Sequence, residues 1–133
     1  MDYNKKAAQV MNTDIVTTTP DLLLTDAIQL MLDHSISSLP VVDEDGMLLG
    51  FITEYDIINF AISGEADRTR VKEAMALAHK VVSFSPDTDL ETMANCFVTQ
   101  RIHRVPIVSD GKVIGMVSRR DILREILRIY RKN

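Results

Sequence analysis

Apolar residues recur at helical spacing in two separate segments of the chain, and two short apolar runs follow each segment. The helical positions are Ala27, Ile28, Met31 and Leu32 in the first segment, and Leu90, Met93, Ala94, Phe97 and Val98 in the second. The apolar runs cover residues 39–42 and 48–52, and residues 105–108 and 113–117, with the turn sequences DEDG and SDG between them. Each segment therefore predicts a helix followed by a pair of strands.

A second helical pattern closes each segment, and a short strand is expected to open it. The closing positions are Ile57, Ile58, Ala61 and Ile62, and Ile122, Leu123, Ile126 and Leu127. The opening strands hold Ile15 and Val16, and Val81 and Val82, each shortly before a proline. Thr88 and Glu91 have the spacing of a capping box for the second long helix. The pattern predicts an α+β protein in which β-α-β-β-α occurs twice.

The two segments are copies of one another. GFITEYD (50–56) matches GMVSRRD (115–121), and TTTPDLLLTDAIQLM (17–31) matches SFSPDTDLETMANCF (83–97). SSLPVVDEDG (37–46) likewise matches HRVPIVSDG (103–111). We divide the chain into a first repeat at residues 1–62, a linker at 63–70 and a second repeat at 71–133. An internal repeat of this size predicts two structural units packed about a pseudo-twofold axis.

Composition narrows the classes of function. A chain of 133 residues, 46% apolar and 26% charged, is an ordinary globular domain. The net charge of −4 argues against nucleic acid as a partner. No apolar run approaches the length of a membrane span, and the first residues lack the apolar core of a signal peptide. Cys96 is the only cysteine, so the chain has no disulfide framework, and we expect the protein to reside in a reducing cytoplasm.

Gly-x-x-[Thr/Ser]-x-x-Asp, found in both copies, has a local interpretation. Thr53 caps the helix that follows, and Asp56 lies in its first turn, where a negative charge is favoured. This interpretation accounts well for one copy. It accounts less well for the recurrence of the motif, together with the preceding proline segments, in both copies.

The doubled motif and its flanking segments resemble the CBS domain, named after cystathionine β-synthase, over roughly residues 8 to 128. The resemblance implies the fold of a CBS pair and an adenosine-containing ligand: AMP, ADP, ATP, S-adenosylmethionine, NAD or cyclic di-AMP. It also implies a regulatory role without catalysis. By resemblance, Asp56 and Asp121 hold the ribose hydroxyls, since a carboxylate has enough lone pairs for both. Thr53 and Ser118, at helix N-termini, suit a phosphate oxygen.

The resemblance also implies an adenine slot in each repeat, built from the opening segment and from the residue just before the proline-containing strand. Its residues are Ile15, Val16 and Ile36 in the first repeat, and Val81, Val82 and Ile102 in the second. Adenine needs an apolar slot because its rings are flat and apolar, while its polar edge pairs with backbone groups. Ordinary core packing is the alternative for all six residues.

A histidine and an arginine distinguish the second repeat from the first. His103 and Arg104 stand where the first repeat has Ser37 and Ser38, and they resemble the His-Arg pair in the last CBS repeat of the γ subunit of AMP-activated protein kinase. The resemblance implies phosphate contacts, and a solvent-facing loop pair is the alternative. In the expected pseudo-twofold arrangement, His103 and Arg104 lie near the phosphates of a ligand held by Thr53 and Asp56. Ser37 then faces the site of Ser118 and Asp121. Arg119 and Arg120 either add phosphate contacts or belong to a solvated basic helix face.

Three hypotheses follow. The first is a non-catalytic adenine-nucleotide sensor that signals ligand occupancy to a regulated protein. The second is an enzyme, which lacks support because none of the common catalytic or phosphate-loop motifs occurs. The third is an oligomerisation module with empty clefts. The histidines and Cys96 show no metal-ligand spacing. The apolar faces predict a homodimer; their residues are Ile57, Ile58, Ala61 and Ile62, and Ile122, Ile126, Ile129 and Tyr130.

Overall fold

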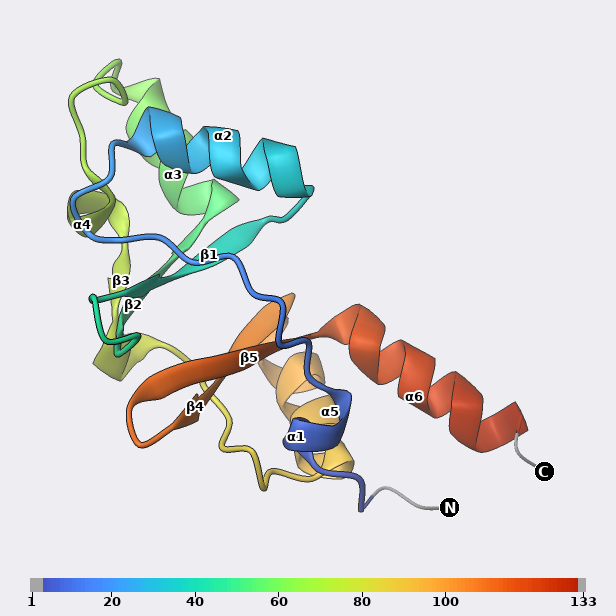
Figure 1. The fold of residues 1–133 in the computed structure, drawn as a ribbon. Helices are drawn as coiled ribbons and strands as arrows, with labels where there is room; N and C mark the ends of the chain where they lie inside the picture. Colours follow the sequence, from blue (N-terminus) through green and yellow to red (C-terminus); the bar gives the residue numbers. More distant parts are fainter. Residues whose placement is uncertain (1–3, 132–133) are drawn as a thin grey trace. The chain divides into compact units, whose positions relative to one another are not determined.

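The computed structural model describes residues 4–131, which fall into two compact units (Figure 1). One unit is the continuous range Val16–Val81. The other combines the residues before Val16 with those from Val82 onward. We call these the central unit and the terminal unit, and describe each by itself.

The central unit holds a small antiparallel sheet covered by helices. Its strands are β1 (Ser38–Val42), β2 (Leu48–Thr53) and β3 (Ala76–Leu77), in the order β1-β2-β3. Its helices are α2 (Leu24–His34), α3 (Glu54–Ile62), α4 (Val71–Ala74) and the 3₁₀ helix η1 (Ala78–Lys80). The fully buried side chains of this core include Leu24, Ala27, Leu39, Val41, Ile52 and Val71.

The terminal unit repeats this arrangement with a two-stranded sheet. Its strands are β4 (Arg104–Ser109) and β5 (Lys112–Ser118), which pair antiparallel. Its helices are α1 (Ala7–Val10), α5 (Leu90–Gln100) and α6 (Arg119–Arg131). The fully buried side chains of this core include Ala7, Leu90, Met93, Val105, Ile107 and Val117. The prediction of an α+β fold with repeated strand pairs is confirmed.

The opening strand predicted for each repeat does not form. Around Ile15–Val16 and Val81–Val82, the chain makes only one isolated parallel bridge per repeat, at Thr18 and at Phe84. Thr18 donates to the carbonyl of Pro40 at 3.0 Å and accepts from Val42 at 2.9 Å. Phe84 makes the equivalent bonds to Pro106 and Val108. Both sheet edges are thus covered by a single residue, and the segment is too short to be a strand.

The two sequence repeats exchange their short first helices. Helix α4, from the second repeat, lies in the central unit, and helix α1, from the first repeat, lies in the terminal unit. Within the central unit, Leu24 N–H donates to Thr69 O at 2.9 Å, and Val71 N–H donates to Leu22 O at 2.9 Å. Within the terminal unit, Leu90 N–H donates to Lys5 O at 2.8 Å, and Ala7 N–H donates to Thr88 O at 2.8 Å. The compact units therefore do not follow the division of the sequence into residues 1–62 and 71–133.

The capping box predicted at Thr88 and Glu91 is wrong by one residue. Helix α5 begins at Leu90, so Asp89 is its N-cap, and Asp89 Oδ1 accepts from Thr92 N–H at 2.8 Å. Hydrogen bonds from the side chain and the backbone of Thr92 hold the pKa of Asp89 below its ordinary value. Thr88 instead accepts from Ser85 N–H at 3.1 Å in the preceding turn.

In the described part of the chain, no helix is long and apolar enough to cross a membrane.

Candidate functional site

Thr53 and Asp56 form a closed capping box at the start of α3. Thr53 Oγ1 accepts from Asp56 N–H at 3.3 Å. Asp56 Oδ2 in turn accepts from Thr53 N–H at 2.9 Å and from Thr53 Oγ1–H at 3.0 Å. Thr53 ends strand β2 with an extended backbone, so the strand places this pair directly at the helix start. The local interpretation of the motif is confirmed for the first repeat.

Ser118 and Asp121 make the same arrangement at the start of α6. Ser118 Oγ accepts from Asp121 N–H at 3.2 Å, and Asp121 Oδ2 accepts from Ser118 N–H at 2.7 Å and from Ser118 Oγ–H at 3.0 Å. Capping therefore accounts for the motif in both copies, although we expected it to account less well for the recurrence of the motif. In addition, Arg124 Nη1 donates to Asp121 Oδ1 at 2.9 Å.

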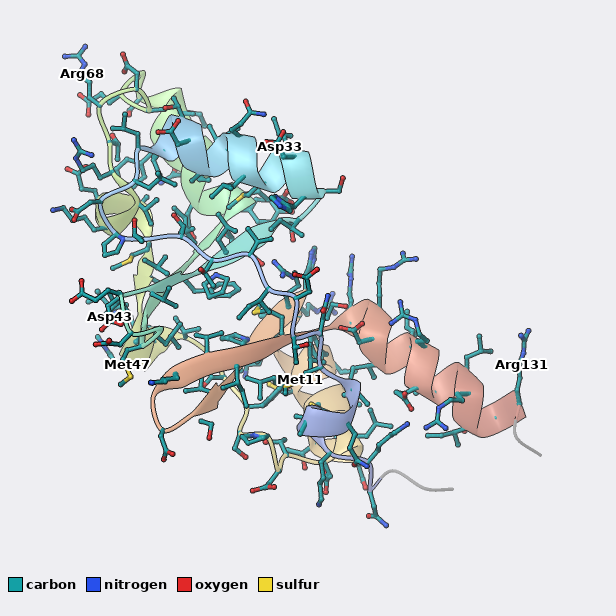
Figure 2. The ribbon with its side chains drawn as sticks, in the orientation of Figure 1. Met11, Asp33, Asp43, Met47, Arg68 and Arg131 are labelled. Atoms are coloured by element: carbon teal, nitrogen blue, oxygen red, sulfur yellow. The ribbon has the colours of Figure 1, made fainter. Side chains whose placement is uncertain are left out.

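The glycine of each motif is required by a methionine of the other sequence repeat. A Cβ on Gly50 would lie 2.5 Å from Ala76 O and 2.8 Å from Met75 Sδ. A Cβ on Gly115 would lie 2.5 Å from Sδ of Met11, which follows α1 (Figure 2). Neither glycine has a positive φ. The missing side chain thus makes room for the segments that follow α1 and α4.

The capping boxes leave one carboxylate oxygen of each motif outside the box. In residues 4–131, all hydrogen bonds of Asp56 go through its backbone or Oδ2, so Oδ1 keeps its lone pairs for another donor. A carboxylate oxygen with free lone pairs can accept from the hydroxyls of a vicinal diol. Oδ2 is meanwhile held in place by two donors from Thr53, so the orientation of the carboxylate is fixed. The arrangement is suited to binding a hydroxylated ligand.

His103 and Arg104 lie at the start of β4, beside the Ser118 motif of their own unit. Arg119 N–H donates to His103 O at 3.0 Å, and Arg104 pairs with Ser118 across the two strands. Burial lowers the pKa of the Arg104 guanidinium, and the negative charge of Asp121 opposes this effect. A guanidinium remains charged at neutral pH despite such a shift. Arg104 is thus a half-buried cation close to the carboxylate of Asp121.

The remaining polar candidates lie at the helix starts or beside them. Ser37 precedes β1 and accepts through its carbonyl from Glu54 N–H at 2.9 Å, next to the Thr53 motif. Arg119 and Arg120 occupy the first turn of α6, and both are exposed, as is His103. Each of these residues lies beside the motif of its own unit.

The apolar candidates divide into two groups. Val16 and Ile36 pack against the core of the central unit, and Val82 and Ile102 pack against the core of the terminal unit. Ile15 and Val81 are half-buried and belong to neither core. Core packing, our alternative for the adenine slot, therefore accounts for part of the role of four of the six residues. An adenine slot built from them stays a prediction.

Arg124 was missed as a neighbour of the motif, because arginines on a helix surface usually form a solvated basic face. Its signal in the sequence was its position three residues after Asp121, a spacing at which helical side chains meet. Asn59 stands at the matching position in the first repeat. Within residues 4–131, no three His, Cys, Asp or Glu side chains gather where they could hold a metal ion.

Comparison with known proteins identifies the repeat. The family model described as CBS domain matches residues 7–63 and 71–128. The CBS domain-containing protein YhcV of Bacillus subtilis is 32% identical over 113 residues, which cover 84% of this chain and 79% of YhcV. Inosine-5'-monophosphate dehydrogenase of Methanocaldococcus jannaschii is 37% identical over 122 residues, 90% of this chain. The chain spans only 23% of the length of that enzyme.

A solved structure shows the same fold with ligands bound. The CBS domain pair of protein MJ0100, in complex with 5'-methylthioadenosine and S-adenosyl-L-methionine, superimposes with a TM-score of 0.80. The two chains are 26% identical, and the match covers 91% of this chain and 98% of the other.

Proposed function

Because this chain belongs to the CBS domain family, we propose that it is a regulatory protein without catalysis that binds an adenosine-containing ligand. The ligand would be held through the Thr53–Asp56 and Ser118–Asp121 motifs. AMP, ADP and ATP are the ligands we favour; S-adenosylmethionine, NAD and cyclic di-AMP are the alternatives. We expect the cytoplasm as its compartment, because Cys96 has no disulfide partner.

The observation that carries this proposal is the geometry of Asp56. Its carboxylate is oriented by two hydrogen bonds to Oδ2 from Thr53, while Oδ1 makes no hydrogen bond to residues 4–131. A rigidly held carboxylate with one open oxygen suits the two ribose hydroxyls, because little side-chain entropy is lost on binding. The presence of two adenosine-containing ligands in the related pair of MJ0100 supports the same ligand class.

We extend the proposal to the phosphates of a nucleotide. In a pseudo-twofold pair, the loop before β4 would serve the ligand of the Thr53 motif, so His103 and Arg104 would bind its phosphates. Ser37 would serve the ligand of the Ser118 motif, together with Arg119 and Arg120. The support is chemical, since a guanidinium forms paired hydrogen bonds with phosphate oxygens.

We also propose that the chain forms a homodimer through its long helices. A groove of about 640 Å³ lies between α5 and α6, with Phe97, Val98, Leu123 and Ile126 among its lining residues. A smaller groove of about 220 Å³ lies between α2 and α3 and is lined in part by Leu32 and Ile58. Leu32, Ile58, Val98 and Leu123 are all more than half exposed. A second copy of the chain would remove this apolar surface from water.

The expected dimer faces need one correction. Ile57 and Ile122 are only 4% and 5% exposed, since they point into the cores, and Ile126 and Ile129 pack against the core of the terminal unit. The exposed large apolar residues of the two closing helices are Tyr55, Ile58 and Ile62 on α3, and Leu123, Leu127 and Tyr130 on α6. The proposed contact therefore keeps Ile58, Ile62 and Tyr130 of the expected faces and adds Tyr55, Leu123 and Leu127.

A second function is favoured by a specific observation. Both motifs are locally complete capping boxes, and Arg124 occupies the remaining oxygen of Asp121. An oligomerisation module with empty clefts would have the same features. Thermal shift measurements separate the two functions: an adenosine sensor gains melting temperature with AMP, ADP or ATP and less with guanine nucleotides. An empty module gains none with any of them.

A further inference from the structure

The two motif aspartates differ in what contacts their second oxygen. Oδ1 of Asp121 accepts from Arg124 Nη1 at 2.9 Å, one turn further along α6. The matching residue on α3 is Asn59, and no hydrogen bond reaches Oδ1 of Asp56 from any residue between 4 and 131. The capping boxes themselves are the same in both repeats. The difference therefore concerns only the oxygen that faces away from the box.

That oxygen is the one a ribose would need. Oδ2 of Asp121 already accepts two hydrogen bonds from Ser118, so its lone pairs are used. A vicinal diol donates two hydrogen bonds, and Arg124 takes part of the remaining capacity of the carboxylate. The side chain of Arg124 is 70% exposed, whereas that of Asp121 is 19% exposed. Arg124 can thus move into solvent at small cost, but a ligand must first displace it.

We infer that Arg124 competes with ribose for Asp121, so that the Ser118–Asp121 motif binds the ribose of adenosine more weakly than the Thr53–Asp56 motif. Arg124 thus makes the two sites unequal toward ribose, separately from the proposed difference in their phosphate contacts. This inference rests on the proposed function. The expected size is about twofold in affinity, the size of an exposed ion pair at this helical spacing.

The experiment is titration calorimetry with adenosine, which carries no charge of its own. Asp56→Asn isolates the second motif, and Asp121→Asn isolates the first. In the Asp56→Asn background, Arg124→Gln raises the affinity for adenosine about twofold. Arg128→Gln is the matched control, because it removes an arginine of the same helix whose partner is Glu125. In the Asp121→Asn background, Asn59→Arg installs the competing cation and lowers the affinity by a similar factor.

Salt provides a second readout. Raising the salt concentration from about 0.05 M to about 0.5 M weakens an exposed ion pair. The affinity of Asp56→Asn for adenosine therefore rises with salt, and the rise disappears in Asp56→Asn with Arg124→Gln. A merely structural role of Arg124 would not produce this dependence with an uncharged ligand.

The outcomes are distinct. If adenosine binds but Arg124→Gln leaves its affinity unchanged or lowers it, the competition is wrong and the proposed function stands. If Arg128→Gln raises the affinity as much as Arg124→Gln, the effect is one of overall charge, and the inference is again wrong. If neither single-motif variant nor the unmodified protein binds any adenosine compound, the proposed function itself fails.

Discussion

Gly115 and Met11 fit together so closely that a Cβ atom on the glycine would lie 2.5 Å from the methionine Sδ. Within the terminal unit, this contact joins the residue after α1 to the centre of β5. Gly50 and Met75 repeat it within the central unit, where a Cβ would lie 2.8 Å from Sδ. The glycine of each motif is thus explained by packing, independently of any ligand.

Gly115→Ala should therefore lower the free energy of unfolding by about 1–3 kcal/mol, the usual cost of an overpacked core. All three close contacts of the added methyl group are with the side chain of Met11. Combining Gly115→Ala with Met11→Ala should recover part of the loss, as measured by urea unfolding in a double-mutant cycle. Gly50→Ala should be rescued less by Met75→Ala, because Ala76 O would still lie 2.5 Å from the added carbon. Strictly additive losses for Gly115 and Met11 would contradict this packing.

Glu125 predicts a pH dependence of stability. Burial raises its pKa, but hydrogen bonds and charges from Arg128 and Lys5 outweigh burial and hold the pKa below the ordinary value of 4.5. A lowered pKa in the folded state means that the stabilisation is complete above pH 4.5 and is lost as pH falls through the folded value. Because Arg128 is half exposed, we expect about 1 kcal/mol at neutral pH.

The measurement compares the unmodified protein with Glu125→Gln by urea unfolding at several pH values. The difference in unfolding free energy should be largest near neutral pH and should shrink in acid. Glu91→Gln, at an exposed position of α5, is the control for removal of one carboxylate. A difference that stays constant down to the lowest pH at which the protein folds would show that the ion pairs of Glu125 contribute nothing.

The proposed homodimer predicts a particle of about twice 15.0 kDa in light scattering at micromolar concentration. Ile62→Glu should convert it to a monomer without unfolding it, because Ile62 is 82% exposed and belongs to no core. Gln29→Glu, on an exposed position of α2, controls for the added charge. A 15.0 kDa particle for the unmodified protein would refute the dimer.

Arg104→Ala should weaken the binding of ATP or ADP more than that of adenosine, because the proposed contact is with phosphate. Charge-assisted hydrogen bonds are roughly twice as strong as neutral ones, so the loss should grow with the number of phosphates. Calorimetric titrations at low and high salt test this, and the difference should fade with salt if the contact is solvent-exposed. Equal losses for adenosine and ATP would mean that Arg104 supports the fold or the base instead.

Short-range features could be predicted from the sequence, and contacts between distant segments could not. The capping of α3 by Thr53 and Asp56 follows from residues three apart, and the strand pairs follow from their apolar runs and turns. At α5 two adjacent capping residues compete, and the sequence alone did not favour Asp89 over Thr88. The prediction of the opening strands was wrong, because a pair of apolar residues before a proline does not distinguish a strand from a single isolated bridge.

Burial was harder to predict where apolar residues are adjacent. Ile57 and Ile58 both fit the helical pattern, yet only Ile57 enters the core of the central unit, because the packing of the whole unit decides which face of α3 is covered. The partner of Gly115 was not predictable either, since Met11 lies in the other sequence repeat. The pairing of Arg124 with Asp121 had a signal in its spacing, but arginines are common on solvated helix faces.

The measurement that tests the central claim most directly is calorimetric titration of AMP into the unmodified protein and into Asp56→Asn with Asp121→Asn. Asparagine retains an acceptor for the capping box, so circular dichroism should show both proteins folded. We predict submillimolar binding by the unmodified protein and a loss of about tenfold or more in the double variant, the scale of a hydrogen bond to a charged group. Equal affinity for both proteins, or no binding of AMP or any other adenosine compound below millimolar concentration, would contradict the account.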